Sequence, residues 1–408
     1  MSKWEEKRLE DIIDVNPPVK LKKGESYPFI DIDKVSPTRR SVTNEEVKVY
    51  DGQSSSKFCD GDTVFSRITP CLENRKIAKV AIEGDAAFGS TEFYVFRAKK
   101  KKADARFTYY LTSSDAVVLP AINSMTGASG RQRADKRFIQ RLKLNLPDLP
   151  TQERIADILS AYDDLIEANN HRIELLEQTA QELYREWFVR FRFPGYENAK
   201  FEDGIPEGWS YVRFGKAIDI IDGDRGVNYP KQEEFYPEGD CLFLNAGNVT
   251  SKGFNFSACS YITKEKDSIL RKGKLQHGDV VLTTRGTVGN VAFYNETMTF
   301  SEMRINSGMV ILRNLGVVSP EYIYTSLRHE YLQKLMTMYA SGSAQPQLPI
   351  KDMKRMKIIK SDTKTMERFT EMSADIYNQI SLLIMKNQTL AKQRDMLLPR
   401  LMSGKLEV

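Results

Sequence analysis

The stretch TQERIADILSAYDDLIEANNHRIELLEQTAQELYREWF, from Thr151 to Phe188, contains no glycine or proline and is dense in leucine, isoleucine, glutamate and glutamine. With Ile155 at heptad position a, mostly apolar side chains recur at positions a and d, the pattern of a helix that packs on another helix. This seam consists of Ile155, Leu159, Tyr162, Ile166, Asn169, Ile173, Leu176, Ala180, Leu183 and Trp187. We expect one long helix here, with Thr151 as its N-cap and its end before Pro194.

A second stretch of the same character runs from Lys364 to about Leu398, and a shift of 214 residues carries the heptad register onto it. Its a positions are all apolar: Phe369, Ile376, Leu383, Leu390 and Leu397. Asn169 and Asn387 place amides in the two seams, which costs stability but fixes one alignment. We expect the two helices to pair within one chain and the second to stop at Pro399. A helix packed on a globular domain is the alternative reading of each stripe.

The chain is also written twice. The run Gly61-Asp62-Thr63-Val64-Phe65-Ser66-Arg67 returns 217 residues later, from Gly278 to Arg285. The segment around Gly127 returns around Gly342, 215 residues on, and Thr151-Gln152-Glu153-Arg154 is echoed by Thr365-Met366-Glu367-Arg368. Echoes in one order at nearly constant offset indicate duplication.

In each copy, about 150 residues of short strand-like runs, broken by turn residues, precede the helical stretch. We therefore predict an α+β fold with two similar strand-rich domains separated by two long helices. The expected segments are a first domain at 1–150, a helical spacer at 151–193, a second domain at 194–361 and a second helical spacer at 362–408.

Composition is that of an ordinary water-soluble protein, with 41% hydrophobic and 28% charged residues in 408. No apolar run approaches the roughly 20 residues that span a bilayer, and the start of the chain carries acids where a secretory signal needs an apolar core. We expect a cytoplasmic protein that does not enter a membrane. The four cysteines form no C-x-x-C pair and the three histidines lie far apart, so no metal site is expected.

The net charge of +5 is modest, but basic residues gather in loop-like segments, which makes nucleic acid a candidate partner. Two loops at equivalent positions carry hydroxyl, amide and guanidinium groups suited to base edges and phosphates. The candidate DNA-binding residues are Thr126, Gly127, Ser129, Arg131, Gln132 and Arg133 in the first loop, and Ser341, Gly342, Ser343, Gln345 and Gln347 in the second. Arg67 and Arg285, which end the two equivalent strands, are further candidates; an ordinary surface loop is the alternative.

Two motifs could carry catalysis. Asn16-Pro17-Pro18-Val19 is similar to the target-amine loop of adenine methyltransferases, but it lacks the aromatic residue that stacks on a flipped base. Glu73 and Lys76 offer part of a nuclease-like E-x-K arrangement without an arguable partner carboxylate for Mg²⁺. The chain has no phosphate-binding GxxxxGK[ST] loop and no HExxH motif. We expect no catalytic residues, with a divergent methyltransferase kept as the enzymatic alternative.

Several strings together resemble the specificity subunits of type I restriction-modification systems. They are the strings LPDLPTQERIADIL at 146–159, LYREWF at 183–188 continuing to FPG at 193–195, IPEGW at 205–209 and LLPRLMSGKL at 397–406. The resemblance covers the whole chain, although the second copy departs from it at Asp362-Thr363-Lys364, where its helix start is less clear.

The resemblance implies two target-recognition domains on an antiparallel helical pair, reading an interrupted, asymmetric site in double-stranded DNA. A helix of 38 residues spans roughly 57 Å at about 1.5 Å per residue, and B-DNA repeats about every 34 to 36 Å, so such a spacer suits two readers. Implied partners are two adenine methyltransferase subunits docked on the helices and, in the full assembly, restriction and translocase subunits. S-adenosylmethionine, ATP and Mg²⁺ would belong to these partners.

The helical residues expected to form the seam or dock a partner are Ile155, Leu159, Tyr162, Ile166, Asn169, Leu176, Leu183, Trp187, Ile376, Leu383, Leu390 and Leu397. Tyr184, Arg185, Trp187 and Phe188 form either an exposed docking surface or part of a buried core. A standalone DNA-binding protein or coiled-coil scaffold is the non-enzymatic alternative.

Overall fold

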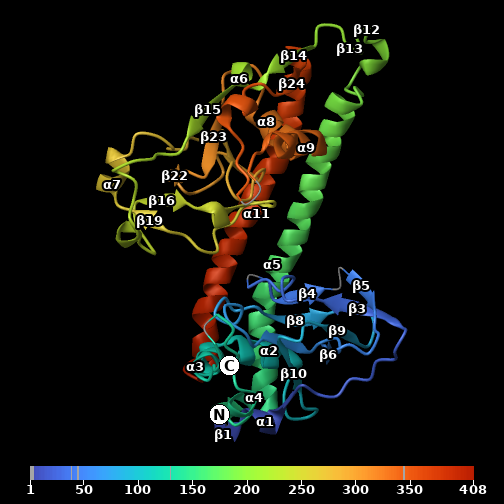
Figure 1. Ribbon diagram of the computed structural model, residues 1–408, viewed down its shortest axis with the longest axis vertical. Coiled ribbons are helices and arrows are strands. Elements are labelled where there is room, and N and C mark those ends of the chain that lie inside the picture. The colour runs from blue at the N-terminus through green and yellow to red at the C-terminus, as the bar shows by residue number, and fades with distance from the viewer. Residues whose placement is uncertain (1–3, 38, 44–45, 129, 343–344) are drawn as a thin grey trace. The chain divides into compact units, whose positions relative to one another are not determined.

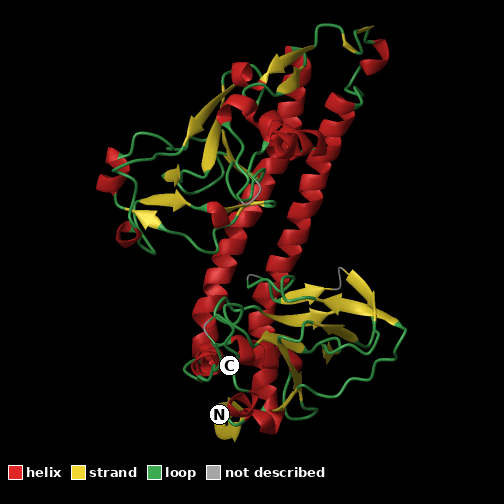
Figure 2. Cartoon of the chain, viewed as in Figure 1, coloured by secondary structure: helices red, strands yellow, loops and turns green. Residues whose placement is uncertain are grey.

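The computed structural model describes residues 4–37, 39–43, 46–128, 130–342 and 345–408. Its contacts divide the chain into two compact units, unit 1 with Met1–Ile166 and Leu390–Val408, and unit 2 with Glu167–Thr389. Each unit combines one strand-rich domain with a segment of each long helix, α5 (Leu149–Tyr184) and α11 (Thr363–Met402), as Figures 1 and 2 show. The predicted α+β class, with two similar domains and two long helices, is confirmed.

Unit 1 contains two main sheets, of strand order β2-β10-β7-β8-β4 and β5-β3-β9-β6, and a separate pair β1-β11 (Figure 1). Its strands are β1 (Trp4–Arg8), β2 (Ile13–Val15), β3 (Ser26–Ile30), β4 (Ser41–Thr43), β5 (Glu46–Val49), β6 (Ser56–Phe58), β7 (Thr63–Ser66), β8 (Ile77–Ala81), β9 (Ala87–Gly89), β10 (Phe93–Ala98) and β11 (Lys143–Pro147). Its short helices are α1 (Leu9–Ile12), α2 (Ala105–Ser113), α3 (Asp115–Asn123) and α4 (Lys136–Gln140).

Unit 2 repeats this order with sheets β15-β23-β20-β21 and β19-β16-β22 and the separate pairs β14-β24, β12-β13 and β17-β18. Its strands are β12 (Phe201–Glu202), β13 (Ile205–Pro206), β14 (Ser210–Arg213), β15 (Ile218–Asp222), β16 (Cys241–Leu244), β17 (Val249–Thr250), β18 (Gly253–Phe254), β19 (Tyr261–Ile262), β20 (Asp279–Thr283), β21 (Val291–Tyr294), β22 (Met303–Ile305), β23 (Met309–Asn314) and β24 (Lys357–Lys360). Its short helices are α6 (Phe214–Ala217), α7 (Lys264–Ile269), α8 (Pro320–Arg328), α9 (Glu330–Tyr339) and α10 (Ile350–Met353), with further single turns at Tyr196–Asn198, Gln232–Glu234 and Ala246–Asn248.

The central sheet of each unit is buried on both faces. In β7, Phe65 packs into the cluster that contains the helices α2 and α3, whereas its neighbour Val64 packs into a cluster with the second sheet. In β20, Leu282 and Val281 divide in the same way between two clusters. Successive side chains of a strand point to opposite faces, so a strand covered on both sides is a continuous apolar run. This explains why the echoed strands read as uninterrupted hydrophobic stretches.

A buried aspartate at the start of the echoed strand forms the same ion pair in both copies. Asp62 accepts hydrogen bonds from Arg97 at 2.7 and 2.6 Å, and Asp279 accepts them from Arg313 at 2.8 and 2.7 Å. Both aspartates are almost completely buried. Because a buried carboxylate needs a paired cation and further donors, these pairs tie β7 to β10 and β20 to β23.

Both long helices begin with the same cap. Oδ1 of Asp148 accepts the backbone N–H of Thr151 at 3.1 Å, and Oδ1 of Asp362 accepts that of Thr365 at 3.0 Å. Thr151 was therefore the wrong choice of N-cap, since the helix already begins at Leu149 and an aspartate one residue earlier satisfies a free N–H group. The second helix, whose start the sequence left unclear, begins in the same way.

The helix ends also differ from the prediction. α5 passes at Tyr184 into a π-helical turn, Arg185–Val189. α11 continues through Pro399 to Met402, so the prediction that this proline ends the helix was wrong. Proline removes one N–H donor, but near a helix end that loss is offset here by packing, because Leu401 is fully buried in the core of unit 1.

Within each unit the two long helices run antiparallel and share a seam. In unit 1, Ile155 and Leu159 of α5 lie in one core cluster with Leu397 and Leu401 of α11. In unit 2, Nδ2 of Asn169 donates to Oδ1 of Asn387 at 2.7 Å, and Nδ2 of Asn387 donates to Asn170 at 2.9 Å. The two amides expected in the seams therefore bind each other, as a polar contact that sets an alignment requires.

The aromatic residues at the end of α5 belong to the core of unit 2. Tyr184, Trp187 and Phe188 are each less than 10% exposed and pack around Phe369 of α11. Of the two readings of these aromatics, the buried core is the one the structure supports, and Arg185 stays partly exposed. No helix in the described ranges is both long and apolar enough to cross a bilayer.

Candidate nucleic-acid interface

The first candidate loop is a hairpin held against the segment that follows β7. Thr126 and Arg133 exchange backbone hydrogen bonds of 3.1 and 2.9 Å. The N–H of Thr69 then donates to the carbonyl of Gln132 at 3.0 Å, and that of Ala134 donates to Arg67 at 2.8 Å. Two segments far apart in sequence are thereby joined by their backbones.

The second candidate loop is held by the same bonds. Ser341 and Gln347 exchange two backbone hydrogen bonds of 2.9 Å. The N–H of Gly286 donates to Pro346 at 3.1 Å, and that of Leu348 donates to the carbonyl of Thr284 at 2.9 Å. The two copies therefore present one backbone frame that differs in its side chains.

This frame corrects two residue equivalences. The sequence paired Arg67 with Arg285 and Gln132 with Gln347. The backbone bonds instead match Arg67 with Thr284 and Arg133 with Gln347, while Arg285 matches Ile68. A slip of one residue on extended backbone turns a side chain to the opposite face, so the two arginines do not occupy equivalent sites.

Two of the candidate arginines in unit 1 share one carboxylate. Glu92 accepts from Arg133 at 2.6 and 2.9 Å and from Arg67 at 3.2 Å. The hydrogen bond from Arg133, helped by the charge of Arg67, holds the pKa of Glu92 below its usual range. The guanidinium of Arg67 also lies 5.5 Å from the centre of the Tyr94 ring. Both arginines are thus oriented and partly neutralised before any ligand arrives.

Two other candidate arginines are not paired in this way. Arg131 is exposed and Arg285 half-buried, and neither forms an ion pair with any residue that the structure describes. A guanidinium without a carboxylate partner keeps all its donors for guanine edges or phosphate oxygens. Gln345 and Gln347 are exposed as well, whereas Gln132 is only partly so.

Glycines shape both loops. Gly127 and Gly342 have φ values of +125° and +99°, a backbone region that side chains with a Cβ rarely adopt. A Cβ at Gly342 would also lie 2.9 Å from the carbonyl oxygen of Gln345. Ser129 and Ser343, also candidates, lie outside the described residues.

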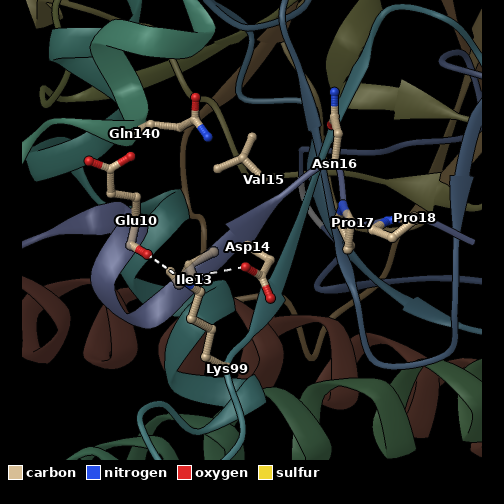
Figure 3. Close-up of a pocket in the computed structure, with 9 residues that line it drawn as sticks. All are labelled: Glu10, Ile13, Asp14, Val15, Asn16, Pro17, Pro18, Lys99 and Gln140. Atoms are coloured by element: carbon tan, nitrogen blue, oxygen red, sulfur yellow. Dashed lines mark hydrogen bonds and ion pairs between the residues drawn. The ribbon is translucent and has the colours of Figure 1, made fainter.

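The methyltransferase-like motif lines a cavity of about 510 Å³ in unit 1 (Figure 3). Asn16 has a φ of +56°, and its Oδ1 accepts the backbone N–H of Val95 at 2.8 Å, while its own N–H donates to the carbonyl of Val95 at 2.7 Å. The side-chain oxygen that would have to hold a target amine is therefore bound to strand β10. Asn16 has a structural role at this place, which weakens the enzymatic reading.

The nuclease-like pair is likewise used for structure. Nζ of Lys76 donates to the carbonyl of Ile32 at 2.9 Å, while Glu73 is exposed. Within the described ranges, no three His, Cys, Asp or Glu side chains gather so that they could hold a metal ion.

Comparison with known proteins agrees with this architecture. A family model described as "Type I restriction modification DNA specificity domain" matches residues 1–178 and 206–380, once in each copy. The type I restriction enzyme MjaIX specificity subunit of Methanocaldococcus jannaschii is 24% identical, with 99% of this chain and 94% of that protein covered. The HindI specificity subunit of Haemophilus influenzae is 23% identical, with 88% and 90% covered.

A solved structure shares the fold. The type I restriction-modification S subunit from M. genitalium matches with a TM-score of 0.53 at 13% identity, covering 98% of this chain and 96% of that one. The family model accounts for most of the chain and repeats as the fold does. The chain therefore belongs to the family of type I restriction-modification specificity subunits, which are non-catalytic DNA-recognition subunits.

Proposed function

We propose that this chain selects the target of a type I restriction-modification complex by reading two different half-sites, one with each unit. The observation that supports this is the identical backbone frame of the two loop pairs, which carries different side chains in the two copies. A common frame places the loops alike, while the side chains on it decide which bases are accepted. The two half-sites should therefore differ in sequence.

In unit 1, Arg131 is the leading candidate for a base contact, because its guanidinium is exposed and unshared among the described residues. Arginine suits the two acceptors of guanine. In unit 2, Gln345 and Gln347 present amides, which suit adenine, and Arg285 adds a cation beside them. Thr126 and Ser341 and the glycine amides of each loop fit phosphate oxygens.

The proposal includes the partners and the cellular setting. Double-stranded DNA and two adenine methyltransferase subunits would bind this chain, the latter on the faces of α5 and α11 left outside the seam. Restriction and translocase subunits would join the full assembly. S-adenosylmethionine, ATP and Mg²⁺ would be held by those partners, and the complex would work in the cytoplasm.

The test is co-expression of the full chain with methyltransferases encoded beside it, followed by mapping of N6-methyladenine. An interrupted, asymmetric methylated motif is expected. Arg131→Gln should relax or abolish one half of the motif, and Gln347→Ala the other half. Lys143→Gln, which removes a surface amine paired with Glu6, is the matched control and should leave the motif intact.

Equal loss at both halves in either variant would contradict the two-reader proposal. A chain that binds DNA without forming any methyltransferase complex would support the standalone regulator instead. Methyl transfer by the purified chain alone would restore the enzymatic reading against the evidence of Asn16.

A further inference from the structure

Unit 2 contains a cavity of about 310 Å³ beside its recognition loop. It is lined by Thr284 after β20, Val310 of β23 and Gln347 of the loop, and by the charged residues Asp222, Arg225 and Lys351. The remaining walls are apolar. Gln347 belongs both to this lining and to the candidate base-reading loop, so a group seated in the cavity would touch the candidate DNA interface.

The cavity lies where unit 1 is filled by a bonded cluster. Strand register matches Val310, opposite Leu282, with Tyr94, opposite Phe65. The N–H of Thr284 donates to Gly308 at 2.9 Å as that of Arg67 donates to Glu92 at 2.9 Å, which matches those two pairs as well.

Four large or charged residues of unit 1 are therefore replaced by small or neutral ones. Tyr94, Arg67, Glu92 and Arg133 correspond to Val310, Thr284, Gly308 and Gln347. In unit 1 these side chains bind one another, with Glu92 between two arginines and Arg67 over the tyrosine ring. The replacements remove both the volume and the charge that occupy this place, and a hollow remains.

The charged groups of the cavity suit one monoanion. Arg225 is half exposed, and its NH2 lies 3.1 Å from Oδ2 of Asp222 and donates to the carbonyl of Ser307 at 3.2 Å. Lys351 is exposed and makes no ion pair within the described ranges. Two cations and one carboxylate leave a net charge of +1 in the lining, which matches the single negative charge of a phosphodiester.

We propose that this cavity seats one deoxyribose-phosphate unit of the DNA backbone at the second half-site, with its phosphate on Lys351 and Arg225. The sugar would pack on the apolar walls, and the seated phosphate would set the register in which Gln347 meets the neighbouring base. This inference rests on the proposed function. It makes Arg225 and Lys351 positioning residues of unit 2 without counterparts in the filled cluster of unit 1.

The test is the salt dependence of DNA binding by the full chain with its methyltransferase partners, measured by fluorescence anisotropy on a duplex with the methylated motif and on an unrelated duplex. Arg225→Gln and Lys351→Gln should each reduce the slope of log affinity against log salt by about 1, equally on both duplexes. Gln347→Ala should instead change the preference between duplexes with the slope kept.

Val310→Tyr copies unit 1 and should close the cavity, giving the same loss of slope with both cations present. Val310→Ile is its conservative control, and Lys334→Gln, an exposed lysine paired with Glu330, controls for loss of a charge. If the tyrosine variant does not fold, the two cation variants still decide the matter.

Unchanged slopes in Arg225→Gln and Lys351→Gln would overturn the inference. A changed base preference with an unchanged slope would show that a base enters the cavity, which also overturns it. Competition by millimolar inorganic phosphate without any slope change in the variants would reveal a free-anion site only. If the wild-type complex binds its motif in any of these cases, the proposed function stands; if it binds no specific duplex, that function itself fails.

Discussion

Asn169 and Asn387, which are 218 residues apart in the chain, bind each other across the helical seam of unit 2, where Nδ2 of Asn169 donates to Oδ1 of Asn387 at 2.7 Å. Asn169 is buried and Asn387 also donates to Asn170. An amide pair in an apolar seam is satisfied in one alignment only, because a shifted helix would leave both amides facing hydrocarbon.

Breaking this amide pair from one side should destabilise unit 2. Asn387→Leu leaves the amide of Asn169 buried without its partner, at a cost of about 1 to 3 kcal/mol. The double variant Asn169→Leu with Asn387→Leu should recover most of this loss, since two leucines pack without a polar group. Thermal melting of the three proteins measures both effects. A double variant less stable than the single one would contradict the argument.

The ion pair between Asp163 and Arg394 should matter more than a surface pair in the same unit. Asp163 is almost fully buried and accepts from Arg394 at 2.5 Å and from the hydroxyl of Tyr110 at 2.5 Å. Asp163→Ala leaves a partly buried guanidinium unpaired, and we expect a loss of about 3 to 5 kcal/mol.

Asp157→Ala is the control for this prediction, since its pair with Arg106 is largely solvated and should be worth less than about 1 kcal/mol. Chemical denaturation monitored by circular dichroism compares the two variants. Similar losses in both would show that burial of the first pair is unimportant.

Glu92 should make unit 1 stability depend on acid. Hydrogen bonds from Arg133 and Arg67 lower its pKa from the usual 4.5, so the folded state keeps this carboxylate ionised at pH values where the unfolded chain binds a proton. The resulting stabilisation is fully present above about pH 4.5 and is lost as the pH falls through the lowered folded-state pKa.

Glu92→Gln should therefore melt at a lower temperature than the wild type at neutral pH, and the difference should shrink as the solution is acidified. Melting curves at a series of pH values test this. The exposed Glu73→Gln reports the effect of simply removing a charge. A difference that grows on acidification would mean that the pKa is shifted the other way.

Gly342 should be needed for the second recognition loop. Gly342→Ala places a Cβ 2.9 Å from the carbonyl oxygen of Gln345 at a φ of +99°, so the loop must change shape. Specificity for one half-site should fall while the other is retained. Gly316→Ala is a matched control, because its φ is +80° but a Cβ there meets no atom within 4 Å. Methylation mapping that shows no difference between the two variants would contradict this prediction.

Much of the candidate interface was visible in the sequence, but its residue pairing was not. The echo of Gly61 in Gly278 located the equivalent strands correctly, since a turn before an apolar run is a local signal. The echo was then extended one residue too far, matching Arg67 with Arg285, because consecutive hydroxyls at Thr283 and Thr284 obscure where the strand ends. Backbone bonds to a loop more than 60 residues away decide that register.

The partnership of Glu92 with two arginines could not be predicted either, because Glu92 lies in a turn between strands and carries no motif. The buried Asp62 and Asp279 could have been found, since each has an arginine near the end of a strand at nearly the same offset, Arg97 and Arg313. A duplicated acid with a duplicated cation is a signal for an ion pair.

The amino-acid sequence by itself determined the two long helices, their heptad seams and the duplication of the chain. These features follow from periodicity and repetition along the chain, which need no knowledge of distant contacts. Only the tertiary structure decided that Tyr184, Trp187 and Phe188 are core, that Glu92 engages two arginines and that unit 2 is hollow where unit 1 is filled. The physical reason is that burial, charge pairing and cavities depend on residues brought together from distant parts of the chain, and each copy filled the same frame with different side chains.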